Sequence, residues 1–242
     1  TITASEPFHA YYMTVSGHMV YDYNGNYIAY KNKDLVTDLP YNEGAQAYMA
    51  TQIELDKAME YLLKGLRDKG MADRTLIVIN ADHYPYGLEK NDYDELAGHQ
   101  LEESFEIYEN SLIFYVDGME AETVDRPCFT LDIVPTIYNL MGLPFDSRLL
   151  MGTDVFSDKD PLVYFADRSW ITDKGKFNAV TGEFFANEDV KLLDQDTYIN
   201  QIQQEVNLKR DLAALILDYD YYSHVLSEET WLLPNKESSY LD

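Results

Sequence analysis

The stretch TLIVINADH, residues 75–83, decides the fold prediction. From Thr75 to Asn80 it is a nearly continuous β-branched and apolar run, which is typical of a strand buried on both faces. Strands of that kind belong to parallel sheets that helices cover on both sides. We therefore predict an α/β fold with a mainly parallel sheet. Asp82 and His83 stand directly after one of its strands.

Helix and strand patterns lie on both sides of this strand. Apolar side chains at spacings of 7, 4, 3 and 4 predict an amphipathic helix over about residues 43–69, and Gly70 is its expected end. These side chains are Tyr48, Leu55, Met59, Leu62 and Leu66. A second β-branched run predicts a strand at 110–116. Residues 131–142 predict a helix with a proline in its first turn and a glycine past its end.

The pattern changes after a further strand at 162–166. Short alternating runs, SWIT, KFNAV and EFFA, are separated by turn residues and predict a small antiparallel meander. A long helix is expected between about 195 and 218. Its expected inward residues are Tyr198, Ile202, Leu212, Leu215 and Ile216. The residues from 218 onward, DYDYYSHVLSEETW, predict no particular element.

Length and composition favour one folded domain. Of the 242 residues, 46% are hydrophobic and 14% aromatic, enough apolar surface to offset the entropy of ordering the chain. A disordered acidic protein is therefore excluded. Repeats and low-complexity segments are absent from the sequence. We expect a single domain over 1–242, made of an α/β part at 1–160, the meander at 161–190, and a helix and tail at 191–242.

The charge balance limits the classes of partner. Eighteen Lys and Arg against 43 Asp and Glu give a net charge of −25, which repels the phosphate backbone, so we expect no nucleic acid partner. Every apolar run is far shorter than the roughly 18 residues that suggest a membrane span. Membrane contact is therefore expected only through a segment outside this chain. The first residues lack both a Met and the pattern of a signal peptide, so we expect the chain to begin within a longer protein.

Asp82 and His83 are candidate metal ligands. Ligands in open parallel α/β sheets bind beyond the carboxyl ends of strands, which is where these two residues stand. A carboxylate oxygen and a neutral imidazole nitrogen suit Zn²⁺ or Mn²⁺, and a turn can direct both side chains to one ion. The alternative is a polar turn that only closes the strand.

His18 occupies a matching position. Phe8 to Val15 is aromatic and β-branched and predicts a strand, which runs through Ser16 and Gly17 into a loop that carries His18. Residues 19–40 predict a long loop excursion. If two strand ends converge, His18 could serve in proton transfer or oxyanion contact beside the metal ligands. By itself it is more typical of a hydrogen-bonded loop residue.

The order of these segments resembles a known family. PFHAYYMTVSGHMVY, the stretch from YNEGAQAYM to TLIVINADHYPYG, and LDIVPTIYNLMGLPFDSRLLMGTDVFS resemble the sulfatase-like catalytic domain of lipoteichoic acid synthases. These enzymes are phosphoglycerol transferases of the alkaline phosphatase superfamily, and the resemblance runs from about residue 5 to 190. It implies an extracellular site on the bacterial cell membrane and a lipid- or glycan-linked phosphate or sulfate ester as substrate.

The resemblance also implies residue roles. The strand-end histidine of the family contacts the transferred phosphoglycerol group, so His18 would be both catalytic and substrate-binding. The paired Asp and His bind the catalytic metal, so Asp82 and His83 would be its ligands. Mn²⁺ is the metal that the resemblance implies, with Zn²⁺, Mg²⁺ and Ca²⁺ as alternatives.

One departure from the family pattern is important. The family has a metal-binding Glu and a nucleophilic Thr in the amino-terminal half of the domain, and neither has a counterpart here. The chain therefore looks like the carboxy-terminal part of a catalytic domain. Alone, we expect it to be inert and to bind metal weakly, with self-association as one way to cover the apolar surface that the missing half would cover. Alternatives are a sulfatase or other ester hydrolase, a phosphoethanolamine transferase of the same superfamily, or a surface module without catalysis.

Other candidate residues fit a catalytic or metal-binding role less well. Cys128 lacks the Cys-x-Pro-x-Arg pattern of a sulfatase formylglycine, and as the single cysteine it forms no internal disulfide. The loop that begins at Asp22 lacks the Gly and Glu that a calcium loop needs at its sixth and twelfth places. His99 lies in an acidic stretch that favours a solvated loop, although the resemblance to phosphoethanolamine transferases, which carry a further His after the Asp-His pair, leaves a place near the site as the alternative.

Overall fold

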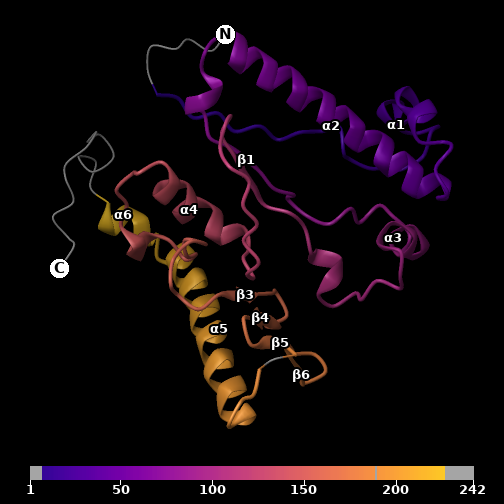
Figure 1. Cartoon of the computed structure of the whole chain (residues 1–242). Coiled ribbons are helices and arrows are strands. Elements are labelled where there is room, and N and C mark those ends of the chain that lie inside the picture. Colours follow the sequence, from indigo (N-terminus) through magenta and orange to yellow (C-terminus); the bar gives the residue numbers. More distant parts are fainter. Residues whose placement is uncertain (1–6, 189, 227–242) are drawn as a thin grey trace. The chain divides into compact units, whose positions relative to one another are not determined.

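The chain divides into two compact units. The computed structural model describes residues 7–188 and 190–226 (Figure 1). The first unit covers residues 1–121 and the second 122–242. The single domain expected from the sequence stays a prediction.

A long helix, α2 (Glu43–Asp68), organises the first unit and confirms the predicted helix. The Asn42 side chain accepts a hydrogen bond from the Ala45 amide and caps its start. After its end, Gly70 has a φ of +61°, a left-handed conformation that favours glycine. Small buried residues on its first half, Ala47 and Ala50 among them, pack against α1 (Tyr27–Lys31) (Figure 1). Small side chains allow this close approach.

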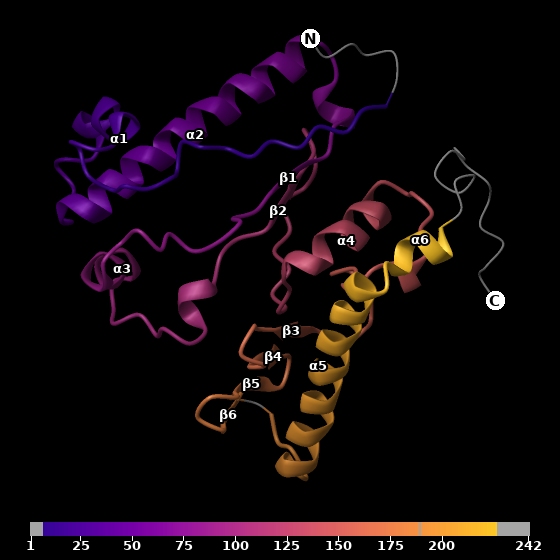
Figure 2. The same ribbon diagram turned by 180° about the vertical axis from the view of Figure 1, so that it is seen from behind.

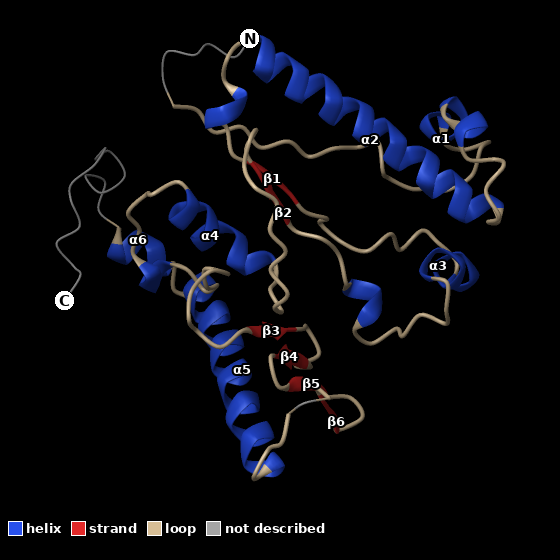
Figure 3. Cartoon of the chain, in the orientation of Figure 1, coloured by secondary structure: helices blue, strands red, loops and turns tan. Residues whose placement is uncertain are grey.

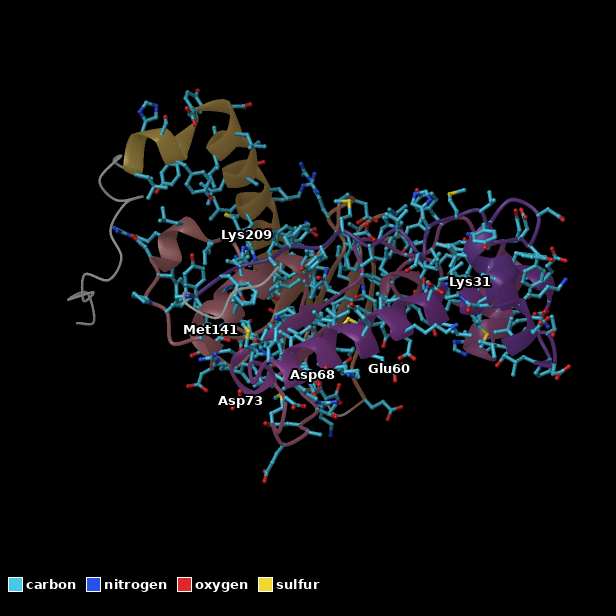
Figure 4. The ribbon with its side chains drawn as sticks, turned by 90° about the horizontal axis from the view of Figure 1, so that it is seen from above. Lys31, Glu60, Asp68, Asp73, Met141 and Lys209 are labelled. Carbon is cyan, nitrogen blue, oxygen red and sulfur yellow. The ribbon has the colours of Figure 1, made fainter. Side chains whose placement is uncertain are left out.

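The predicted inward stripe of α2 is only partly correct. Leu66 is buried, together with Met71 and Ala72, whereas Tyr48 and Leu55 are half-buried. The opposite face is exposed and rich in charged residues of both signs, among them Glu60 and Asp68 in Figure 4.

Two short strands follow α2. After a 3-10 turn at Ala72–Arg74, β1 (Ile77–Ile79) pairs with β2 (Ile113–Tyr115), which confirms both predicted strands (Figure 2). Their pairing is antiparallel, and so is every other strand pairing in the described residues. The mainly parallel sheet predicted from the sequence is therefore not found there. The expected burial of β1 on both faces is not found either, since all three of its residues are half-buried. An apolar run predicts a strand, but the partner strand sets the direction of pairing.

The loop between β1 and β2 contains a helix, α3 (Lys90–Ala97), and a 3-10 turn at Glu106–Tyr108. The Asp92 side chain accepts a hydrogen bond from the Glu89 amide at the start of α3, which forms a capping box. Gly98 follows the last turn with a φ of +75°.

The amino-terminal segment corrects two predictions. Residues 8–15 form no strand: they are in no regular element and are exposed, with Tyr11 79% and Met13 75% accessible. β propensity reflects packing on a sheet surface, and this segment pairs with no strand in the described part of the chain. The expected loop excursion at 19–40 instead contains α1 and a 3-10 turn at Lys33–Leu35.

The second unit begins with α4 (Ile133–Leu140), preceded by a 3-10 turn at Thr130–Asp132, and confirms the predicted helix at 131–142. The buried Asp132 carboxylate accepts hydrogen bonds from the amides of Phe129 and Thr153. These bonds hold the start of the helix against the segment that follows a 3-10 turn at Ser147–Leu149.

The antiparallel meander is also confirmed. Its strands are β3 (Leu162–Tyr164), β4 (Trp170–Thr172), β5 (Gly175–Asn178) and β6 (Glu183–Ala186), paired in that order (Figure 3). Trp170 is fully buried, and its ring lies 5.9 Å from that of Tyr198 on α5 (Gln195–Asp218). The Thr172 hydroxyl is hydrogen-bonded to the Tyr198 hydroxyl at 2.8 Å.

Helix α5 has the predicted bounds, and its inward face is partly as predicted: Tyr198, Ile202 and Ile216 are half-buried. Val206 is fully buried, whereas Leu212 and Leu215, expected inward, are 42% and 48% exposed. An apolar stripe identifies a helix without identifying which part of it is covered. A short helix, α6 (Tyr221–Val225), follows, and the rest of the unassigned tail lies outside the described residues.

Candidate functional site

Asp82 and His83 lie in an exposed loop directly after β1. The Asp82 carboxylate accepts a hydrogen bond from the His83 amide at 3.0 Å. His83 Nδ1 is 2.7 Å from the Tyr84 carbonyl oxygen. Because a carbonyl oxygen only accepts, Nδ1 carries the hydrogen and Nε2 keeps its lone pair. A histidine that binds a metal through one ring nitrogen usually donates a hydrogen bond from the other ring nitrogen in this way.

The spacing of the two side chains fits a shared divalent ion. Asp82 Oδ2 and His83 Nε2 are 3.7 Å apart. Two ligands at about 2.1 Å from a tetrahedral ion lie roughly 3.4 Å from each other, so a small side-chain rotation suffices. The side chains are 75% and 44% exposed, which leaves room for further ligands. In the part of the chain that the structure describes, no group of three His, Cys, Asp or Glu could hold a metal ion.

Tyrosines support this loop. The His83 ring lies against Tyr86, with centroids 4.7 Å apart, and Tyr84 lies edge-on to Tyr108 at 5.3 Å. The Tyr93 hydroxyl donates a hydrogen bond to the Pro85 carbonyl at 2.7 Å. Burial, followed by nearby tyrosines, raises the pKa of Tyr93 to about 12, so the hydroxyl keeps its proton. Sequence reasoning missed these residues, although YPYG directly after Asp82 and His83 was a visible signal.

His18 lies in a turn that is held by two side chains. The Tyr21 hydroxyl donates to the Gly17 carbonyl at 2.9 Å. The Asn26 amide donates to the carbonyls of His18 at 3.0 Å and Val20 at 2.8 Å. The exposed His18 ring has Nδ1 2.9 Å from the Met19 carbonyl, which leaves its Nε2 as the atom with a lone pair.

The turn of His18 and the loop of Asp82 and His83 meet at Gly87. A Cβ at this glycine would lie 2.8 Å from the Met19 Cβ and 3.1 Å from Tyr21 Cε2. Burial is the main cause that raises the pKa of Tyr21 to about 12, and the charge of Asp82 adds to it. The structure thus brings the two loops together, although in the described residues no hydrogen bond or ion pair joins His18 to Asp82 or His83.

The remaining candidate residues make contacts that suit a structural role. Burial raises the pKa of the half-buried Cys128 thiol, which disfavours the reactive thiolate. His99 Nε2 is 2.5 Å from Glu106 on an exposed surface. Asp22 accepts hydrogen bonds from the amides of Asn24 and Gly25, as in an Asx turn.

Comparison with known proteins decides the family. The sequence matches the Sulfatase family model over residues 2–143, more than half of the chain. The chain belongs to the sulfatase family. This confirms the resemblance seen in the sequence, and the sulfatase family implies an α/β fold of the alkaline phosphatase type.

The sulfatase chain also has relatives with named activities. It is 28% identical over 213 residues to lipoteichoic acid synthase 1 and 22% identical over 222 residues to lipoteichoic acid synthase 2, both of Bacillus subtilis (strain 168). It is 24% identical over 223 residues to lipoteichoic acid synthase of Staphylococcus aureus (strain USA300). The alignments cover 81%, 89% and 89% of this chain but 31%, 33% and 33% of the relatives. The chain therefore spans about a third of their length.

Proposed function

We propose that the chain is the carboxy-terminal part of a metal-dependent phosphoglycerol transferase of the lipoteichoic acid synthase type. The observation that carries this proposal is the pair Asp82 and His83, 3.7 Å apart after β1, with the His83 ring oriented by a carbonyl. Membership of an enzyme family and lipoteichoic acid synthase relatives support the reaction class.

The proposed metal is Mn²⁺, with Zn²⁺, Mg²⁺ and Ca²⁺ as alternatives. Asp82 supplies an anionic oxygen and His83 supplies Nε2 as ligands. When bound, the ion stabilises negative charge on the phosphoryl oxygens and activates a hydroxyl nucleophile. The nucleophilic Thr and the further Glu ligand, which have no counterpart in this sequence, would come from the rest of a longer protein.

His18 has a separate role in the proposal. Its Nδ1 donates to the Met19 carbonyl, so Nε2 is the atom that can bind the phosphoglycerol group or exchange a proton with it. The substrate is a lipid- or glycan-linked phosphate ester, or a sulfate ester if the protein is a hydrolase. We place the reaction at the extracellular face of the bacterial cell membrane. In the described residues no helix has the length and apolar character needed to cross a membrane.

One observation favours a second candidate, a surface module without catalysis. The described residues hold two neighbouring donors rather than the three or more of a catalytic metal centre. Metal-dependent turnover in the complete protein distinguishes the two functions.

The test uses the complete protein that contains this chain. Asp82→Ala and His83→Ala are each expected to abolish Mn²⁺-dependent turnover and to lower the bound Mn²⁺ measured by elemental analysis. His18→Ala is expected to impair turnover with the metal retained. Glu60→Ala, on the exposed face of α2, is the matched control and should change neither. Full activity of Asp82→Ala would overturn the assignment.

A further inference from the structure

A single side chain joins the turn of His18 to the helix that follows it. Asn26 is the amino-terminal cap of α1, where its Oδ1 accepts hydrogen bonds from the amides of Ile28 at 3.0 Å and Ala29 at 3.1 Å. Its Nδ2 donates to the carbonyls of His18 and Val20. One amide group therefore caps α1 through its oxygen and holds the turn of His18 through its nitrogen.

The two ends of the amide have separable effects. The acceptor end stabilises α1, as an Asp at the cap would also do. The donor end fixes the backbone on either side of Met19, and only an amide supplies it. Among the described residues, no other side chain donates a hydrogen bond to the carbonyl of His18 or Val20.

The direction of the His18 ring depends on this backbone. His18 Nδ1 donates to the carbonyl of Met19, the residue between the two carbonyls that Asn26 holds. Tyr21 supports the same turn from the other side through its hydroxyl, and its ring lies edge-on to Tyr48 of α2, with centroids 5.3 Å apart. The turn is therefore anchored to α1 and α2.

We infer that Asn26 is a positioning residue that sets His18 for the phosphate ester. The inference rests on the proposed function, in which His18 binds the phosphoglycerol group. If the Nδ2 bonds are lost, the Met19 carbonyl is no longer held, and the His18 ring loses its preferred tautomer and direction.

Asn26→Asp is the decisive variant, because it retains the cap acceptor but turns two donors into an oxygen that repels the carbonyls. Asn24→Asp is the matched control: it adds the same charge to the same exposed loop, and its side chain makes no hydrogen bond of its own among the described contacts. In the 242-residue chain, the long-range ¹H–¹⁵N spectrum of the imidazoles, assigned with His18→Ala, reports the tautomer of His18.

We expect the Nδ1–H tautomer of His18 to dominate in the wild type and in Asn24→Asp, and to give way to a tautomer mixture in Asn26→Asp. In the complete protein, Asn26→Asp is expected to raise the KM for the phosphoglycerol donor by about tenfold, the equivalent of one lost hydrogen bond. Bound Mn²⁺ should be unchanged.

The outcomes separate the inference from the proposed function. A wild-type tautomer spectrum in Asn26→Asp overturns the inference. A changed spectrum together with wild-type kinetics in both Asn26→Asp and His18→Ala overturns the role of His18 in the proposed function instead. If Asn26→Asp loses its circular dichroism spectrum and does not fold, Asn26→Ser replaces it: serine keeps a cap acceptor for α1 but lacks the Nδ2 donors to the His18 and Val20 carbonyls, and an unchanged His18 spectrum there also overturns the inference.

Discussion

The imidazole of His83 rests against the ring of Tyr86, with centroids 4.7 Å apart and planes inclined at 45°. This contact and the bond from Nδ1 to the Tyr84 carbonyl orient the His83 ring. Residues that orient a metal-binding histidine typically change metal affinity by ten- to a hundredfold when they are removed.

Tyr86→Ala is therefore expected to weaken Mn²⁺ binding by the chain about tenfold, whereas Tyr86→Phe should keep the wild-type affinity. Isothermal titration with Mn²⁺ measures both. Tyr61→Ala removes a tyrosine that is 83% exposed and is the control. Equal affinity in Tyr86→Ala and Tyr61→Ala would show that the ring contact does not orient the ligand.

Gly87→Ala should separate the turn of His18 from the loop of Asp82 and His83. The added methyl would lie 2.8 Å from the Met19 Cβ, closer than carbon atoms pack, so one loop must move. We expect a loss of stability of about 1–3 kcal/mol, as for other overpacked sites, and faster amide exchange at residues 17–21.

Gly65→Ala is the matched control for that substitution. Gly65 lies within α2, and a Cβ there meets nothing within 4 Å. The same change should therefore stabilise the protein by about 0.5–1 kcal/mol through helix propensity. Urea unfolding of both variants gives the comparison, and a stabilising Gly87→Ala would refute the close contact.

The pair His99 and Glu106 should make stability depend on pH. The hydrogen bond to Glu106 raises the pKa of His99. The stabilisation of the fold by protonated His99 is therefore complete below the ordinary histidine pKa of about 6.5 and is lost as pH rises through the raised pKa. The Glu102 amide first, and His99 second, lower the pKa of Glu106. The stabilisation of the fold by ionised Glu106 is present above the ordinary glutamate pKa of about 4.3 and is lost as pH falls through the lowered pKa.

His99→Ala should accordingly lower the melting temperature most at about pH 5–6 and have little effect at pH 9. Thermal melts of the wild type and the variant at both values test this. His224→Ala, at the exposed end of α6, is the control. A difference of the same size at pH 5.5 and pH 9 would mean that the ion pair does not contribute.

The 242-residue chain assayed alone is expected to be inert toward a phosphodiester in the presence of Mn²⁺. Asp82 and His83 leave most coordination positions of an ion to water, and weak binding without a nucleophile gives no turnover. Release of the alcohol product is the measurement. Turnover that Asp82→Ala removes would show that the nucleophile lies within this sequence.

Local patterns in the sequence were sufficient to predict the elements that are defined by residues close together in the chain. The bounds of α2 and α5 follow from apolar spacing and from end residues such as Gly70, and the meander follows from turn residues between short alternating runs. The place of Asp82 and His83 just past a strand was also predictable, because an apolar run that stops at polar residues marks a strand end.

Tertiary structure alone decided the features that depend on a distant partner. Residues 8–15 have strand propensity but no partner strand in the described chain, and β1 takes an antiparallel neighbour that an apolar run does not specify. Likewise, the amide of Asn26 and the missing side chain of Gly87 acquire their roles only where the turn of His18 comes close. Sequence determines which hydrogen bonds and contacts a residue can make, whereas the fold determines which atoms come within reach.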